Sequence, residues 1–181
     1  MSIKQSAGMS LLETMIAMAV VSIGLLGIVS SIISTLTLTN ANHEEALAMN
    51  YARRQMSALE ALQSKANFST IFANYNHVTT KLDQSTDANQ NLSQGVVTVY
   101  FPTDSTGTKL VETPGSFDPN PVLMGVPSSG LDLNNDGRID GASTDHSGDY
   151  KLLPVTVRVT WMSSEGARVL DLHNLLVQLK P

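Results

Sequence analysis

A stretch of 30 residues without Asp, Glu, Lys or Arg, from Thr14 to His43, constrains this chain more than any other feature. Within it, residues 15–38 include 16 Ala, Val, Ile, Leu or Met and no proline that would break a helix. About 20 apolar residues are enough to cross the hydrocarbon core of a bilayer as a helix. A secretory signal has a shorter apolar core, of roughly 7 to 15 residues. The segment is therefore predicted to span a membrane.

The charges at the two ends of this segment predict its orientation. Lys4 and the N-terminal amine precede it, whereas Glu44 and Glu45 follow it. Because positive charge is retained on the cytoplasmic side, we expect a cytoplasmic N-terminus and an exported remainder. Glu13 lies at the leading edge of the apolar run, where an ionisable group is costly enough to indicate a function.

The residues around Glu13 carry a resemblance to a known family. Met1-Ser-Ile-Lys-Gln-Ser-Ala-Gly8, then Met9-Ser-Leu-Leu-Glu13 and the apolar run, resembles the N-terminal region of type IV prepilins. The resemblance implies that a prepilin peptidase cleaves between Gly8 and Met9 and methylates the new N-terminus at Met9. It also implies that Glu13 of one subunit pairs with the Met9 amine of a neighbour during assembly, since a buried charge is tolerated when paired. A plain membrane anchor is the alternative.

Two further segments are similar to PilV-type minor pilins. Val21-Ser-Ile-Gly-Leu-Leu-Gly27 resembles their anchor, and a strand ending in Thr160-Trp161, followed by a Gly-containing turn and an apolar strand, resembles their C-terminal hairpin. Major pilins usually carry a proline where Ser30 stands here. The resemblance therefore favours a minor type IV pilin that primes or joins the pilus and influences adhesion, motility or DNA uptake. A minor pseudopilin of a type II secretion system has the same leader, helix and sheet and remains the alternative.

The family also implies a location and partners. We expect a single-pass protein of the bacterial inner membrane with its C-terminal domain in the periplasm, which later enters the pilus filament or its tip. The expected partners are the prepilin peptidase, other minor and major pilins, the inner-membrane assembly platform of the pilus, and the lipid bilayer.

The expected fold is α+β, the type IV pilin fold, in which a long N-terminal helix packs on an antiparallel β-sheet. After the anchor, small and apolar residues recur at helical spacing at Met49, Ala52, Met56, Leu59 and Ala66, which predicts one buried stripe on an otherwise polar helix. The expected organisation is a leader at 1–8, the membrane or filament-core half of the helix at 9–39, its amphipathic half at 40–66, and a β-sheet domain with variable loops at 67–181.

Within the last region, polar residues predominate from 67 to 94, around a small apolar cluster of Phe68, Ile71, Phe72 and Tyr75. We interpret this part as a surface loop with a short helical turn. Apolar residues alternate with polar ones from Val155 to Trp161, which predicts a strand with one buried face. The strands expected are 96–101, a weaker one at 122–126, and a C-terminal hairpin of 155–161 and 169–179 around a turn at 163–166.

A possible calcium site lies between these strands, in Asp132-Leu-Asn-Asn-Asp-Gly-Arg-Ile-Asp140. Alternating oxygen ligands, a glycine for the sharp turn and an apolar anchor at Ile139 match the first part of an EF-hand loop. Ser143 stands where that loop has a bidentate Glu, and Asp145 or Asp149 could substitute. A solvated turn is the alternative interpretation. The candidate ligands are Asp132, Asn134, Asp136, the carbonyl of Arg138, Asp140 and Asp145.

The remaining composition argues against other classes of function. Acidic residues exceed basic ones by 16 to 11, and no Lys/Arg cluster with aromatics is present, so nucleic-acid binding is not expected. There is no cysteine, and the four histidines are scattered without the spacing of metal ligands. No catalytic motif is present, so we do not expect an enzyme.

Overall fold

The computed structural model describes residues 11–63, 68–82, 92–113 and 124–178 of the chain. The chain forms two compact units, Met1–His43 and Glu44–Pro181. The leader at 1–8 and the cleavage position Gly8-Met9 lie outside the described residues.

The first element is one unbroken helix, α1, over Leu11–Glu60. No proline interrupts these 50 residues, and the helix continues through Ser30. The helix ends at Glu60. Beyond Ala61, the backbone N–H groups of Leu62 and Gln63 donate to carbonyls three residues back instead of four. The prediction of a helix to residue 66 is therefore wrong for residues 61–63, which form a turn. Residues 64–66 lie outside the described residues.

The second half of α1 buries one face, as predicted. Ala48, Ala52, Met56 and Leu59 are buried, at steps of four, four and three residues. Ala48 replaces Met49 in the expected stripe, since Met49 is only half-buried, and Ala66 lies outside the described residues. The two alanines in this stripe belong to the same buried cluster as apolar residues of the sheet.

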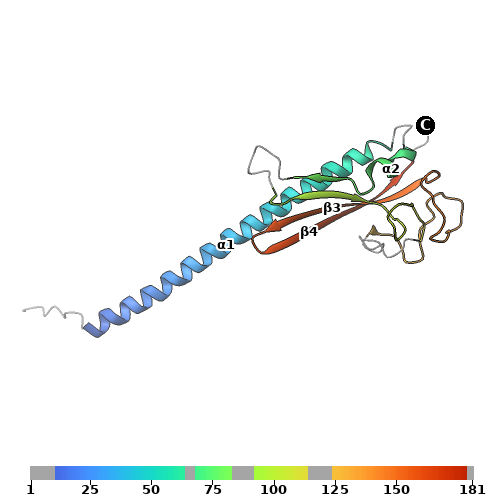
Figure 1. Ribbon diagram of the computed structural model, residues 1–181. Helices are drawn as coiled ribbons and strands as arrows, with labels where there is room; N and C mark the ends of the chain where they lie inside the picture. Colours follow the sequence, from blue (N-terminus) through green and yellow to red (C-terminus); the bar gives the residue numbers. More distant parts are fainter. Residues whose placement is uncertain (1–10, 64–67, 83–91, 114–123, 179–181) are drawn as a thin grey trace, which may run out of the picture. The chain divides into compact units, whose positions relative to one another are not determined.

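The sheet has four antiparallel strands in the order β1-β2-β3-β4 (Figure 1). The strand predicted at 96–101 is confirmed as β2, whereas a strand at 122–126 is wrong for its described part, because residues 124–126 do not form a strand. β1 was not predicted, because its three residues are polar and all exposed. The strands are β1 Thr79–Lys81, β2 Val96–Tyr100, β3 Leu152–Ser163 and β4 Gly166–Val177.

The C-terminal hairpin of β3 and β4 is confirmed and longer than predicted. Val155, Val157 and Val159 are fully buried on the face of β3 that meets the core. The register pairs Ser163 with Gly166, so the turn has two residues between the strands. Gly166 has a φ of +121°, a conformation that side chains disfavour, so glycine fits the end of this turn.

The segment at 67–94, predicted as a surface loop, contributes to the core at its beginning, and its residues 67 and 83–91 lie outside the described residues. The predicted helical turn is present, as the 3₁₀ helix η1 (Phe68–Thr70) and the helix α2 (Ile71–Tyr75). However, Phe68, Ile71 and Phe72 are all buried, so their apolar cluster packs inward. The Tyr150 hydroxyl donates to the Phe68 carbonyl at 2.5 Å and accepts from the Phe72 N–H at 3.2 Å. Burial raises the pKa of Tyr150, which keeps the hydroxyl protonated as a donor.

Two side-chain hydrogen bonds hold the second half of α1 on the hairpin. At its beginning, Trp161 Nε1 on β3 donates to Glu44 Oε2 at 3.1 Å. At its end, Asn174 Nδ2 on β4 donates to Glu60 Oε1 at 2.6 Å. The helix is therefore fixed against the sheet both by its apolar stripe and by a polar contact near each end.

A pair of leucines on the hairpin tests where the core lies. We expect Leu153→Ala, which empties a fully buried site, to lower the free energy of unfolding by about 2 to 5 kcal/mol. Leu175→Ala removes the same atoms from a side chain that is 43% exposed, so its cost should be about 1 kcal/mol or less. Urea unfolding of the full chain in mild detergent, followed by fluorescence of Trp161, the single tryptophan, measures both. Equal costs would contradict this assignment of the core.

Candidate functional site

The first candidate region is the apolar part of α1, which is exposed in the described structure. Every residue from Leu11 to Leu36 is exposed, including large apolar side chains such as Ile23 and Leu26. α1 is long and apolar enough to cross a membrane, and none of its most apolar window is buried. This exposure is unlike a helix in a soluble core, and it implies that lipid or other apolar helices cover the segment.

The hydroxyl groups in this segment are compatible with an apolar environment. Five of them donate to the carbonyl four residues earlier in the helix, at 2.8 to 3.0 Å. A hydroxyl that is paired in this way does not have to find water. The donors are Ser22, Ser34, Thr35, Thr37 and Thr39.

Glu13 lies in the first turn of α1 and is exposed. The free N–H groups of the first turn favour a negative charge there. Its expected partner, the Met9 amine of a neighbouring subunit, lies outside the described residues, so this role stays a prediction.

The second candidate region is the long connection between β2 and β3. Its described parts meet around Glu112, whose side chain is only 1% exposed. Glu112 Oε1 accepts from the backbone N–H of Leu133 at 2.7 Å and of Asn134 at 3.4 Å. Glu112 Oε2 accepts from the backbone N–H of Asp140 at 2.7 Å. One buried carboxylate therefore holds both ends of the predicted calcium loop.

The loop itself curls as its motif predicts. Asp132 Oδ2 accepts from the Gly137 N–H at 2.8 Å, and Asp136 Oδ1 accepts from the Arg138 N–H, also at 2.8 Å. Gly137 has a φ of +89°, which explains the glycine at this place. The amide of Asn134 lies 3.4 Å from a carboxylate oxygen of Asp136, so these side chains gather on the inside of the turn.

Two other expectations about this loop change. Ile139 is 46% exposed and is not the core anchor; the fully buried Leu133 has that role. Asp145, a candidate calcium ligand, has its Oδ1 atom directed to backbone N–H groups, those of Leu110 and Ser147. Asp149 is the distant acid that approaches the loop, with Oδ2 3.4 Å from Asn134 Nδ2.

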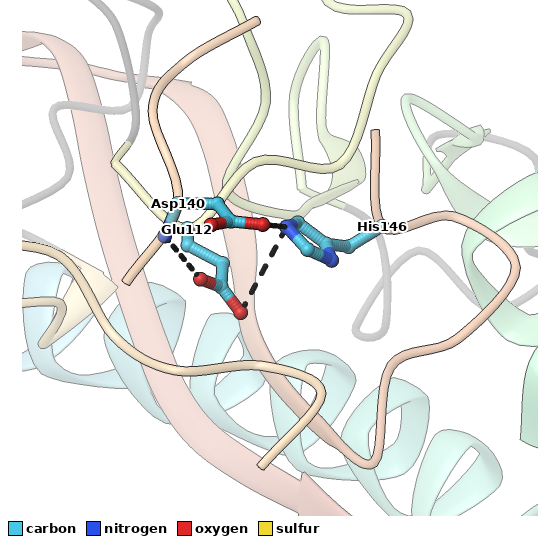
Figure 2. A group of neighbouring side chains, drawn as sticks. All are labelled: Glu112, Asp140 and His146. Carbon is cyan, nitrogen blue, oxygen red and sulfur yellow. Dashed lines mark hydrogen bonds and ion pairs between the residues drawn. The ribbon is translucent and has the colours of Figure 1, made fainter. Parts of the chain in front are cut away.

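Asp140 also belongs to a group of three side chains that could hold a metal ion, together with Glu112 and His146 (Figure 2). One oxygen of each carboxylate and a nitrogen of the imidazole lie within 4.8 Å of one another. Sequence reasoning did not find this group, because Glu112 and Asp140 are 28 positions apart and no periodic pattern relates them.

The buried carboxylate of Glu112 can be tested as the organiser of the connection. In Glu112→Gln, one acceptor oxygen becomes an NH₂ group that faces a backbone N–H, and hydrogen bonds to a charged group are lost. We expect the free energy of unfolding to fall by about 2 kcal/mol or more, measured by urea unfolding of the full chain. Glu165→Gln, in the exposed hairpin turn, is the control and should have little effect. Equal effects of the two substitutions would contradict the structural role of Glu112.

Comparison with known proteins concerns the N-terminal region. Residues 3–29 match the prokaryotic N-terminal methylation motif. No curated protein and no solved structure shows a significant match to the chain. The match includes Gly8, Met9 and Glu13, and it continues into the exposed apolar part of α1. Together with a long helix on an antiparallel sheet, the motif indicates a membrane-anchored structural subunit of the type IV pilin or pseudopilin kind, which a prepilin peptidase processes.

Proposed function

We propose that this chain is a minor type IV pilin, a subunit that primes or joins a pilus and influences adhesion, motility or DNA uptake. The observation that carries the proposal is the methylation motif at residues 3–29, which runs directly into an exposed apolar helix. A subunit with such a helix is stable in a bilayer and, after extraction, only where other apolar helices replace the lipid.

A minor component, similar to PilV-type pilins, is favoured by two features. The helix passes through Ser30 without the proline that is usual in major pilins. The domain also ends in the long β3–β4 hairpin, whose strand β3 closes with Thr160, Trp161 and two further residues. Under this proposal the domain from Glu44 onward lies in the periplasm before assembly.

Assembly requires the charged end of an apolar helix to leave water. Peptidase cleavage after Gly8 would create an amine at Met9, and methylation preserves its positive charge. Glu13 of a neighbouring subunit could neutralise that amine in the filament core, where an unpaired charge is strongly disfavoured. The pairing would also set the axial position of one subunit relative to the next.

The role of Glu13 gives the main test of this function. In the native host, we expect Glu13→Ala to remain in the membrane at normal abundance but to fall at least about tenfold in sheared pili, because a broken buried pair costs about 3 to 5 kcal/mol. Glu45→Ala, on the exposed surface of the same helix, is the matched control and should assemble normally. Immunoblots of membrane and sheared-pilus fractions measure both.

The same strains separate the pilin from the alternative. Normal abundance of Glu13→Ala in pili would contradict the assembly mechanism. A wild-type chain that is absent from pili, together with a deletion that blocks type II secretion but leaves pili unchanged, would replace the proposal with a minor pseudopilin.

We further propose that calcium binds the acidic loop of the domain. Asp132, Asn134 and Asp136 gather inside the turn, the Arg138 carbonyl follows them, and Asp149 approaches from the far side. Hard oxygen donors of this kind suit calcium. Without the bidentate Glu of an EF-hand, we expect an affinity in the micromolar to millimolar range.

Calcium should therefore stabilise the full chain. At about 100 times the dissociation constant, the melting temperature in mild detergent should rise by about 5 to 10 °C. Asp136→Asn should remove most of this increase, whereas Asp104→Asn, in another acidic turn of the same connection, should preserve it. A melting temperature unchanged at several millimolar calcium would leave the loop as a solvated turn.

A further inference from the structure

His146 has an imidazole nitrogen that the structure leaves without a hydrogen bond. The residue is only 2% exposed, and its Nε2 atom is buried with no hydrogen-bond partner among the residues that the structure describes. Leaving such a group unsatisfied costs about 1 to 3 kcal/mol. A buried polar atom of this kind requires a physical explanation.

The groups that face Nε2 are both acidic. Asp140 Oδ2 lies 3.7 Å away and Glu112 Oε1 lies 3.9 Å away, and both carboxylates face the same nitrogen of the ring (Figure 2). These distances exceed those of hydrogen bonds. They are instead a few tenths of an ångström above the roughly 3.3 to 3.6 Å that separates two ligand atoms of one tetrahedral metal ion with bonds of about 2.0 to 2.2 Å.

The other nitrogen of the ring determines what Nε2 can do. Nδ1 lies 3.2 Å from Asp149 Oδ1, and an ionised carboxylate only accepts hydrogen bonds. Nδ1 therefore carries the proton, and in the neutral ring Nε2 presents a lone pair toward Glu112 and Asp140. A lone pair that faces two carboxylates is repulsive unless a cation lies between them.

We propose that Glu112, Asp140 and His146 bind a divalent transition-metal ion such as Zn²⁺. The ligands are Glu112 Oε1, Asp140 Oδ2 and His146 Nε2, and the two carboxylates balance the charge of the ion. An imidazole ligand favours zinc and its neighbours over calcium, which prefers six to eight oxygen ligands. With three protein ligands, the fourth tetrahedral position is left for water or another donor.

The surrounding contacts orient these ligands. Asp149 fixes the imidazole in the manner of the carboxylate–histidine–metal arrangement. The backbone N–H groups of Leu133 and Asp140 hold the two oxygens of Glu112. Within the acidic loop at 132–140, only the last residue, Asp140, belongs to this site, since Asp132 and Asp136 are turned toward the backbone N–H groups of residues 136–138.

The ion would join three segments of the connection between β2 and β3. Glu112, Asp140 and His146 come from different parts of this connection, and the chain has no cysteine with which a disulfide could link them. A metal bound here would restrain parts of the connection that belong to no strand of the sheet.

The test uses the full chain in mild detergent, freed of metal with a chelator and then titrated with Zn²⁺. We expect one zinc per chain, counted by elemental analysis, and a rise in melting temperature. His146→Gln should weaken zinc binding by at least about a hundredfold, and Asp149→Asn, which only orients the ring, by about 10 to 100-fold. His173→Gln changes an exposed histidine on β4 and is the matched control, with no expected effect.

A second measurement on the wild-type chain needs no substitution. Zinc should shift the Nε2 resonance of His146 in ¹⁵N NMR and leave the Nδ1 proton in place. The proposal is overturned if zinc does not bind saturably, if His146→Gln binds as tightly as wild type, or if the spectrum shows Nε2 carrying a proton that zinc does not displace. It is also overturned if Asp136→Asn abolishes zinc binding while His146→Gln does not, because the ion would then occupy the acidic loop.

Discussion

The exposed apolar surface of α1 is the constraint on which the rest of this molecule depends. A run such as Leu11 to Leu36, with large aliphatic side chains and no ionic group after Glu13, is not stable in water by itself. Its hydroxyl groups donate to backbone carbonyls of the same helix, so the segment needs few other hydrogen-bond partners. The chain must therefore have an apolar environment at its N-terminal end at every stage, and the methylation motif indicates which process supplies it.

The second half of the same helix faces the opposite requirement. Its buried stripe is narrow, and two of its four buried residues are alanines. This stripe packs in one buried cluster with the sheet, and the hydrogen bonds of Glu44 with Trp161 and of Glu60 with Asn174 fix the position of the helix along it. One continuous helix thus suits two environments. Its side chains change from mostly apolar to mostly polar with one buried stripe, whereas its backbone stays helical.

Much of this could be predicted from the sequence because it depends on local periodicity. The apolar run, the stripe that includes Ala52, Met56 and Leu59, and the alternation in β3 each repeat with the period of their element. The helical turn around Phe68, Ile71 and Phe72 is predictable, but the burial of these side chains is not, because polar residues surround them in the sequence. β1 was missed because its residues contribute pairing but no apolar face.

The candidate metal group shows the limit of such reasoning most clearly. The loop at Asp132 to Asp140 has a motif and could be found, although the acid that approaches it, Asp149, could not be chosen over Asp145. Glu112 and His146 have no local pattern at all. They come together because backbone hydrogen bonds, such as Leu131 N–H to the Glu112 carbonyl and His146 N–H to the Leu110 carbonyl, align segments that are distant in sequence.

The strand order also has a consequence for the time course of folding. β3 lies between β2, which ends at Tyr100, and β4, which ends at Val177. Because β4 follows the other three strands in the sequence, the sheet cannot close until β4 has been synthesised. The apolar segment of α1 leaves the ribosome long before that, so it needs an apolar environment before the core of the domain has formed.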